Sequence, residues 1–158
     1  MSLSAQGRSG AAVPLDARED AAWRGFLRTY AAVVGELDAE LRAEHDLTLS
    51  GYEVLRFLDD APDGRLRPGE LSAAALLTPS GITRLCDRLE RDGLVRREAC
   101  DDDGRGSLVV LTDAGRERSR AARVTHLDGV RRRFLERLAA ADVDTLGVVW
   151  RRLAEPTA

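Results

Sequence analysis

The sequence predicts a mainly α-helical protein with one small β-hairpin, and three observations lead to this fold class. Apolar residues recur at intervals of three and four along most of the 158 residues, as they do on one face of an amphipathic helix. Capping residues such as Ser, Thr and Asp stand where these periodic segments begin. An acidic loop rich in glycine, residues 100–106, separates two short runs of β-forming residues.

Length and composition favour a single soluble domain. A chain of 158 residues, 44% of them hydrophobic and 32% charged, suffices for one core but not for two ordinary domains. We expect a disordered arm over residues 1–15 and one domain over residues 16–155. The formal net charge is −3, and all 24 basic residues are arginines. Any binding of nucleic acid must therefore come from a local arrangement of charge.

The chemistry-bearing residues are few. Cys86 and Cys100 show neither metal-ligand nor disulfide spacing, and the two histidines stand near no nucleophile at a catalytic spacing. No apolar run is long enough to span a membrane, and the beginning of the chain lacks an apolar leader. We therefore expect a cytoplasmic protein that is not an enzyme, needs no cofactor or metal, and makes no membrane contact.

The first helix is expected from about Ala17 to Glu44. Asp16 and Glu19 form a capping box ahead of it. At 1.5 Å per residue, about 28 residues span about 40 Å, which is longer than so small a core can cover. We expect the overhang to pack on a second copy of the chain. The apolar stripe consists of Trp23, Phe26, Leu27, Tyr30, Val34, Leu37 and Leu41.

Two short helices should follow. Ser50 and Glu53 repeat the capping-box pattern ahead of a helix that ends near Ala61, where a Pro-Asp-Gly turn comes next. Proline at a helix start then predicts a second short helix, Pro68 to Leu76.

A third helix of this group has the clearest start signal, because Thr78 can cap it and Pro79 suits its first position. It should run from Pro79 to Asp92 and stop at Gly93. One face is apolar, with Ile82, Leu85, Cys86 and Leu89, and the opposite face carries Ser80, Thr83, Arg84, Asp87, Arg88 and Arg91. Such a face can read the major groove of DNA. The pattern also suits a solvated helix whose arginines pair with Asp87, Glu90 and Asp92.

A β-hairpin directly after this helix would be the wing of a winged helix-turn-helix, spanning about residues 47–112. Its strands should be Leu94 to Ala99 and Ser107 to Leu111, joined by the loop from Cys100 to Gly106. Arg105 in that loop has the reach and charge to enter a narrow minor groove. A solvent-exposed turn is the simpler use of such a loop, but its position after the reader helix favours the wing.

Two more helices should complete the domain. Thr112 can cap a long helix from about Asp113 to Ala139, and Asp142 opens a last helix with its own apolar stripe. Together with the first helix, these segments, about residues 17–44 and 113–154, are expected to form a dimer.

The run from Leu71 to Gly115 resembles the winged helix-turn-helix of the MarR family of bacterial transcriptional regulators. The resemblance is carried by LSAAALLTPSGITRLCDRLERDGLVRR and by DGRGSLVVLTDAG, and the order of helices extends it from about Asp16 to Glu155. It implies a homodimer that presents two winged modules to pseudo-palindromic operator DNA.

The resemblance also implies roles for individual residues. In the major groove it implies contacts from Thr83 and Arg84, next to Ser80 at the start of the reader helix. It implies a DNA-backbone contact or helix bracing for Arg88. It further implies that Arg105 enters the minor groove, oriented by Asp103. Arg97 is expected to brace the wing rather than to read sequence.

Family members often bind small aromatic anions between the dimerisation helices and the winged module. Tyr30, Tyr52 and His126 are the candidates for such an effector pocket, although packing or surface roles would also account for them. The leading interpretation is a dimeric, ligand-responsive DNA-binding repressor with a small aromatic or phenolic effector. The alternative is a dimeric winged-helix module that binds proteins and has lost DNA affinity, since the wing is acidic.

Overall fold

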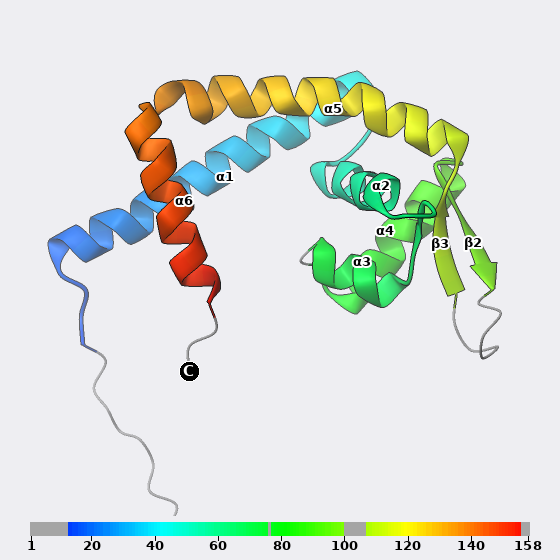
Figure 1. Cartoon of the computed structure of the whole chain (residues 1–158), viewed down its shortest axis with the longest axis horizontal. Helices are drawn as coiled ribbons and strands as arrows, with labels where there is room; N and C mark the ends of the chain where they lie inside the picture. Colours follow the sequence, from blue (N-terminus) through cyan, green and yellow to red (C-terminus); the bar gives the residue numbers. More distant parts are fainter. Residues whose placement is uncertain (1–12, 76, 100–106, 156–158) are drawn as a thin grey trace, which may run out of the picture. The chain divides into compact units, whose positions relative to one another are not determined.

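The computed structural model describes residues 13–75, 77–99 and 107–155 (Figure 1). It confirms the predicted fold class, a mainly helical chain with a small antiparallel sheet. The elements are α1 (Ala17–His45), α2 (Leu49–Asp60), β1 (Arg65–Leu66), α3 (Pro68–Ala74), α4 (Pro79–Arg91), β2 (Val95–Ala99), β3 (Ser107–Leu111), α5 (Asp113–Arg133), a 3₁₀ turn η1 (Leu135–Arg137) and α6 (Ala140–Ala154). Most of the predicted arm, residues 1–15, lies outside the described ranges.

The chain divides into two compact units, Met1–Ala32 and Val33–Ala158, so the boundary falls within α1. In the first unit, the predicted capping box opens α1: the Asp16 N–H donates to Glu19 Oε2 at 2.9 Å, and the Glu19 N–H donates to Asp16 Oδ1 at 2.8 Å. Trp23, Phe26 and Tyr30 follow as a stripe of neighbouring rings, with centroids 5.9 and 6.2 Å apart.

In the second unit, three helices begin with the same Thr-x-x-Gly pattern. Thr48, Thr78 and Thr112 each accept a hydrogen bond from the backbone N–H of the glycine three residues later. A Cβ at Gly51 or at Gly81 would lie 3.1 Å from the capping Oγ1, so glycine leaves room for the cap. The N-cap of α2 is therefore Thr48, and the predicted Ser50 cap is wrong.

The core of this unit lies under the short helices and the sheet. Leu41 from α1, Tyr52 and Leu55 from α2, Leu71 from α3 and Val109 from β3 are all 1% exposed or less. The helix α5 contributes small residues instead: its buried positions are Gly115, Ser119, Ala122 and Gly129. Small side chains let α5 approach its neighbours closely, and a Cβ at Gly129 would lie 2.6 Å from Leu37 Cδ2 of α1.

The sheet has three strands in the order β1-β3-β2, all antiparallel. Both predicted hairpin strands are confirmed, with Arg97 opposite Val109 and Val95 opposite Leu111. The strand β1 was not predicted, because two residues are too few to show the alternation of a strand. Arg65 pairs with Val110 and Leu66 pairs with Val109. The strand β1 is therefore defined by its pairing with β3.

The boundaries of the last helices differ from the prediction. The helix α5 ends at Arg133 rather than Ala139, since Phe134 leaves helical geometry at φ −122° and ψ −63°. No glycine or proline marks this point in the sequence. Asp142 does not open α6 but occupies its third position, where Oδ2 accepts the Ala139 N–H at 3.0 Å.

An ion-pair cluster holds the end of α5 against α1. The Arg133 side chain, 14% exposed, donates to Glu36 Oε2 at 2.5 Å and to both carboxylate oxygens of Glu40 at 2.5 and 3.0 Å. The hydrogen bonds from Arg133 lower the pKa of Glu40 below its usual value. The cluster therefore ties the last residue of α5 to α1.

Candidate nucleic-acid interface

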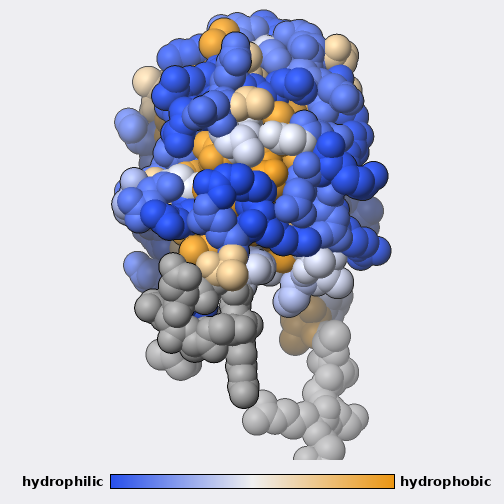
Figure 2. All heavy atoms as spheres, turned by 90° about the vertical axis from the view of Figure 1, so that its right-hand side faces the viewer, coloured by the Kyte–Doolittle hydropathy of each residue, from blue (hydrophilic) through white to orange (hydrophobic). Residues whose placement is uncertain are grey.

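The helix α4 separates its residues into two faces, as the sequence predicts. Ile82, Cys86 and Leu89 are buried at 1 to 2% exposure, and they seat the helix on the core together with α3 and β2. On the other side Ser80, Thr83, Arg84 and Arg91 are exposed. Figure 2 shows a largely hydrophilic surface at the end of the molecule that carries β2 and β3.

Two of the exposed side chains of α4, those of Thr83 and Arg84, bond to carbonyls of their own helix. Thr83 Oγ1 donates to the Pro79 carbonyl at 2.9 Å, and Arg84 Nε donates to the Ser80 carbonyl at 3.3 Å. Within the described ranges no carboxylate lies within ion-pair distance of Arg84, whereas Arg88 Nε lies 3.7 Å from Asp92 Oδ2. The arrangement leaves Arg84 able to reach an external partner.

Arg97 of β2 braces the strand against α4, as expected. Its Nη2 donates to Asp87 Oδ1 at 2.5 Å, its Nη1 lies 3.6 Å from Glu90 Oε2, and its backbone N–H donates to Glu90 Oε1 at 3.1 Å. The hydrogen bond that Arg97 donates to Asp87 raises the pKa of the guanidinium above its usual value. Asp87 and Glu90 thus pair with a strand residue rather than with arginines of their own helix.

The wing loop carries two of the predicted contact residues, Asp103 and Arg105, and both lie outside the described residues. The strands that present the loop are described up to Ala99 and from Ser107. Between those strands and α4, Gly93 turns the chain at φ +71°, which suits glycine.

Thr112 and Gly115 join the wing to α5. The Thr112 hydroxyl lies 2.8 Å from the Gly93 carbonyl oxygen and 3.0 Å from the Leu94 carbonyl oxygen. The backbone N–H of Thr112 also donates to the Leu94 carbonyl, at 3.2 Å. The same hydroxyl accepts the Gly115 N–H at 3.0 Å. The start of α5 is therefore bonded directly to the connection between α4 and β2.

Two of the three effector candidates contact each other. The rings of Tyr52 on α2 and His126 on α5 have centroids 4.8 Å apart and are tilted by 35°. His126 Nδ1 is buried, and none of the described residues offers it a hydrogen bond. Tyr30 belongs to the first unit and is 59% exposed, so it is not part of this ring pair within the second unit.

The Tyr52–His126 contact predicts a dependence of stability on pH. Burial lowers the pKa of His126 below its usual 6.5, so the folded chain binds this proton less readily than the unfolded chain. The contribution of His126 is fully present above about pH 6.5 and is lost as the pH falls below that value. Urea unfolding of the wild-type chain and of His126→Gln between pH 5 and 8 should show a smaller acid loss in the variant. An equal loss in both would contradict this origin.

Cys86 is a core residue rather than an accessible thiol. It is 2% exposed, and burial raises the pKa of the thiol, which disfavours the reactive thiolate. Cys100 lies outside the described residues.

A groove that the sequence did not reveal lies where α1 ends beside α5. It has a volume of about 650 Å³, and charged side chains from several elements line it, among them Arg42, Glu44, Asp92, Glu117 and Arg118. Across the described ranges, no three His, Cys, Asp or Glu side chains gather as a metal site would require. No described helix is long and apolar enough to traverse a bilayer.

Comparisons with known proteins place the chain in a family. A model of the MarR family matches residues 45–106, which contain the helix-turn-helix and the first strand of the wing. The chain is 38% identical over 76 residues to the transcriptional repressor YetL of Bacillus subtilis. This match covers 48% of this chain and 46% of YetL, so it spans less than half of the length of YetL. It is 37% identical over 97 residues to the transcriptional regulator HosA of Escherichia coli, covering 61% of this chain and 70% of HosA.

The fold agrees with these sequence matches. The MarR family regulator Sco3205 of Streptomyces coelicolor, solved in complex with DNA, is 33% identical, with a TM-score of 0.87 over 92% of this chain and 94% of Sco3205. The resemblance therefore extends beyond the winged module to the flanking helices. This chain belongs to the MarR family of DNA-binding transcriptional regulators.

Proposed function

We propose that the chain is a homodimeric, ligand-responsive repressor that binds pseudo-palindromic operator DNA in the cytoplasm and catalyses no reaction. The observation that carries the DNA contact is α4, whose apolar face is buried while Ser80, Thr83 and Arg84 stand exposed and bond only to the helix and its N-cap Thr78. The name of the repressor YetL supports repression, and the complex of Sco3205 with DNA supports the mode of binding.

We assign contact residues on α4 by their exposure, and in the wing by the sequence alone. Arg84 and Thr83 read base edges in the major groove, with Ser80 at the start of the helix close to the DNA backbone. Arg88, in the last turn of α4, contacts a phosphate or braces the helix. Arg105, oriented by Asp103, enters the minor groove from the wing tip.

Dimerisation is supported by apolar side chains that the single chain leaves in solvent. Val124 and Leu127 on α5 are 71% and 48% exposed, and Leu153 on α6 is 71% exposed. The helix α6 has no buried residue at all, although its apolar residues recur at helical spacing. Large apolar side chains left exposed on several helices are typical of a surface that packs against a partner.

The Tyr52–His126 pair supports an effector site for a small aromatic or phenolic molecule. The buried His126 Nδ1, beside the Tyr52 ring, has no hydrogen-bond partner among the described residues, and a ligand hydroxyl could provide one. Tyr30 is the third candidate residue. The pair lies between α2 of the winged module and α5, so a ligand here would act on the packing of those two helices.

Replacing Arg105 with alanine tests the DNA-binding proposal at the wing. The variant should bind a promoter fragment more weakly by about 1 to 3 kcal/mol per lost contact, while light scattering gives the same dimer mass. Mobility-shift titrations against the wild-type chain measure the loss. Equal affinity would remove Arg105 from the contact surface, and no binding by the wild-type chain at low salt would favour the protein-interaction module instead, because phosphate contacts strengthen as salt falls.

A further inference from the structure

A carboxylate occupies the middle of the face of α4 that we assign to DNA. Asp87 lies four residues after Thr83, three after Arg84 and four before Arg91, so helical spacing places all four side chains on one face. The Asp87 side chain is 46% exposed. A bare carboxylate there would repel nearby phosphates, because charges within about 8 to 10 Å interact at physiological salt.

Arg97 is the cation that faces this carboxylate, and it comes from a different element. It binds Asp87 at 2.5 Å and approaches Glu90 at 3.6 Å, while its own N–H donates to Glu90 at 3.1 Å. Three contacts thus join β2 to one side of α4. The neighbouring Arg96 pairs instead with Glu98 of its own strand. Its register partner is Val110 of the central strand β3.

We propose that Arg97 is a positioning residue for DNA binding that acts in two ways: it fixes the wing strand against α4, and it offsets the Asp87 and Glu90 carboxylates beside the DNA. The proposal rests on the assignment of α4 as the reading helix. On this proposal, the reading face of α4 can carry the negative charge of Asp87 because the positive charge of Arg97 compensates it.

The two roles leave different signatures. Loss of a brace weakens binding equally at all salt concentrations, whereas exposed carboxylates weaken it most at low salt, where repulsion is least screened. In Arg97→Gln the affinity should fall about tenfold at low salt, and the loss should shrink as salt rises. In Asp87→Asn with Arg97→Gln the exposed charge is removed as well, so most of the low-salt loss should be recovered.

Arg96→Gln is the matched control, since it removes the same charge from the same strand without touching α4. Its affinity should stay within about twofold of the wild type, as for a surface ion pair. Equal losses for Arg96→Gln and Arg97→Gln, or a loss in Arg97→Gln that does not change with salt, would overturn the charge-offsetting role.

Hydrogen exchange of the free protein tests the brace without DNA. The Arg97 amide, which donates to Glu90, and its neighbours in β2 should exchange faster in Arg97→Gln than in the wild type or Arg96→Gln. Unchanged exchange would overturn the brace even if the wild-type chain binds no DNA. Absent wild-type binding would overturn the DNA assignment and the charge-offsetting role with it.

Discussion

Arg84→Ala is expected to weaken operator binding about a hundredfold. A guanidinium that reads a base or a phosphate contributes about 1 to 3 kcal/mol, and the proposed dimer would present two copies of α4, so the loss would be counted twice. The fold should not change, because Arg84 is exposed and bonds only to the Ser80 carbonyl of its own helix. Mobility-shift or fluorescence-anisotropy titrations at two salt concentrations would measure the change.

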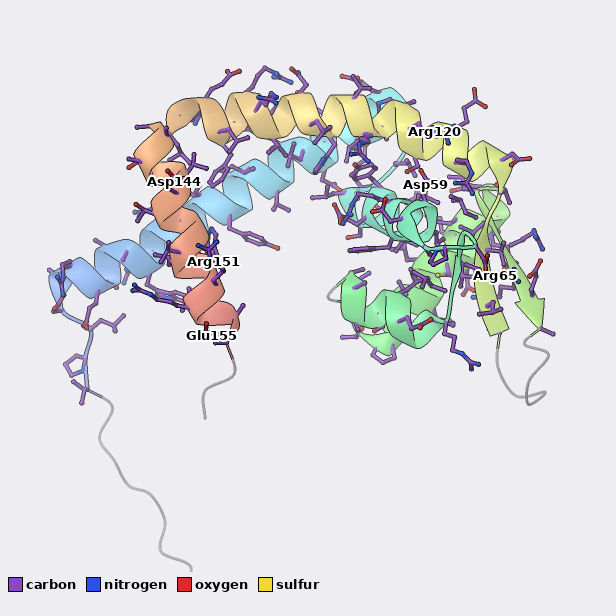
Figure 3. All side chains as sticks on the ribbon, in the orientation of Figure 1. Asp59, Arg65, Arg120, Asp144, Arg151 and Glu155 are labelled. Carbon is purple, nitrogen blue, oxygen red and sulfur yellow. The ribbon has the colours of Figure 1, made fainter. Side chains whose placement is uncertain are left out.

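Arg120→Ala is the matched control for this substitution. Arg120 is exposed on α5 (Figure 3), and its replacement removes the same charge away from α4. Its effect should stay within about threefold, the size of a general charge effect. Equal losses in the two variants would show that net charge, rather than the reading face of α4, governs affinity. A changed base preference in Arg84→Ala alone would identify the base that it reads.

Gly115→Ala is expected to lower the free energy of unfolding by about 3 kcal/mol, at the upper end of overpacking costs. The added Cβ would lie 2.0 Å from the Leu94 carbonyl oxygen and 2.8 Å from Leu111 Cδ1. The first of these is backbone, which cannot rotate away as a side chain can. That carbonyl also accepts the Thr112 N–H, so any shift would loosen the joint between the wing and α5. Thermal unfolding should show a midpoint about 6 to 12 °C lower.

Gly69→Ala separates this effect from the general cost or gain of replacing a helical glycine. Gly69 lies in the first turn of α3, and its added Cβ would meet nothing within 4 Å. Alanine is the better helix former by about 1 kcal/mol, so this variant should be as stable as the wild type or slightly more stable. If Gly115→Ala behaved in the same way, the close approach of α5 to Leu94 would not exist in solution.

The candidate site was partly predictable because its signals are local. The Thr78-Pro79 start and the apolar stripe of Ile82, Cys86 and Leu89 define α4 without any distant contact. The exposed face with Thr83 and Arg84 follows from the same periodicity. The partners of Asp87 and Glu90 were not predictable in this way, since helical spacing suggested arginines of α4, whereas the structure supplies Arg97 from β2.

The sequence by itself determined the helices, the capping residues Thr78 and Thr112, the hairpin strands and the family, because caps, periodicity and turn residues act over a few positions. Tertiary structure alone decided the two-residue strand β1, the end of α5 at Arg133, the Tyr52–His126 contact and the Arg97 brace. Each of these joins residues far apart in the chain. Their free energy comes from packing and ion pairs that form only after the helices and strands have assembled, so no local pattern reports them.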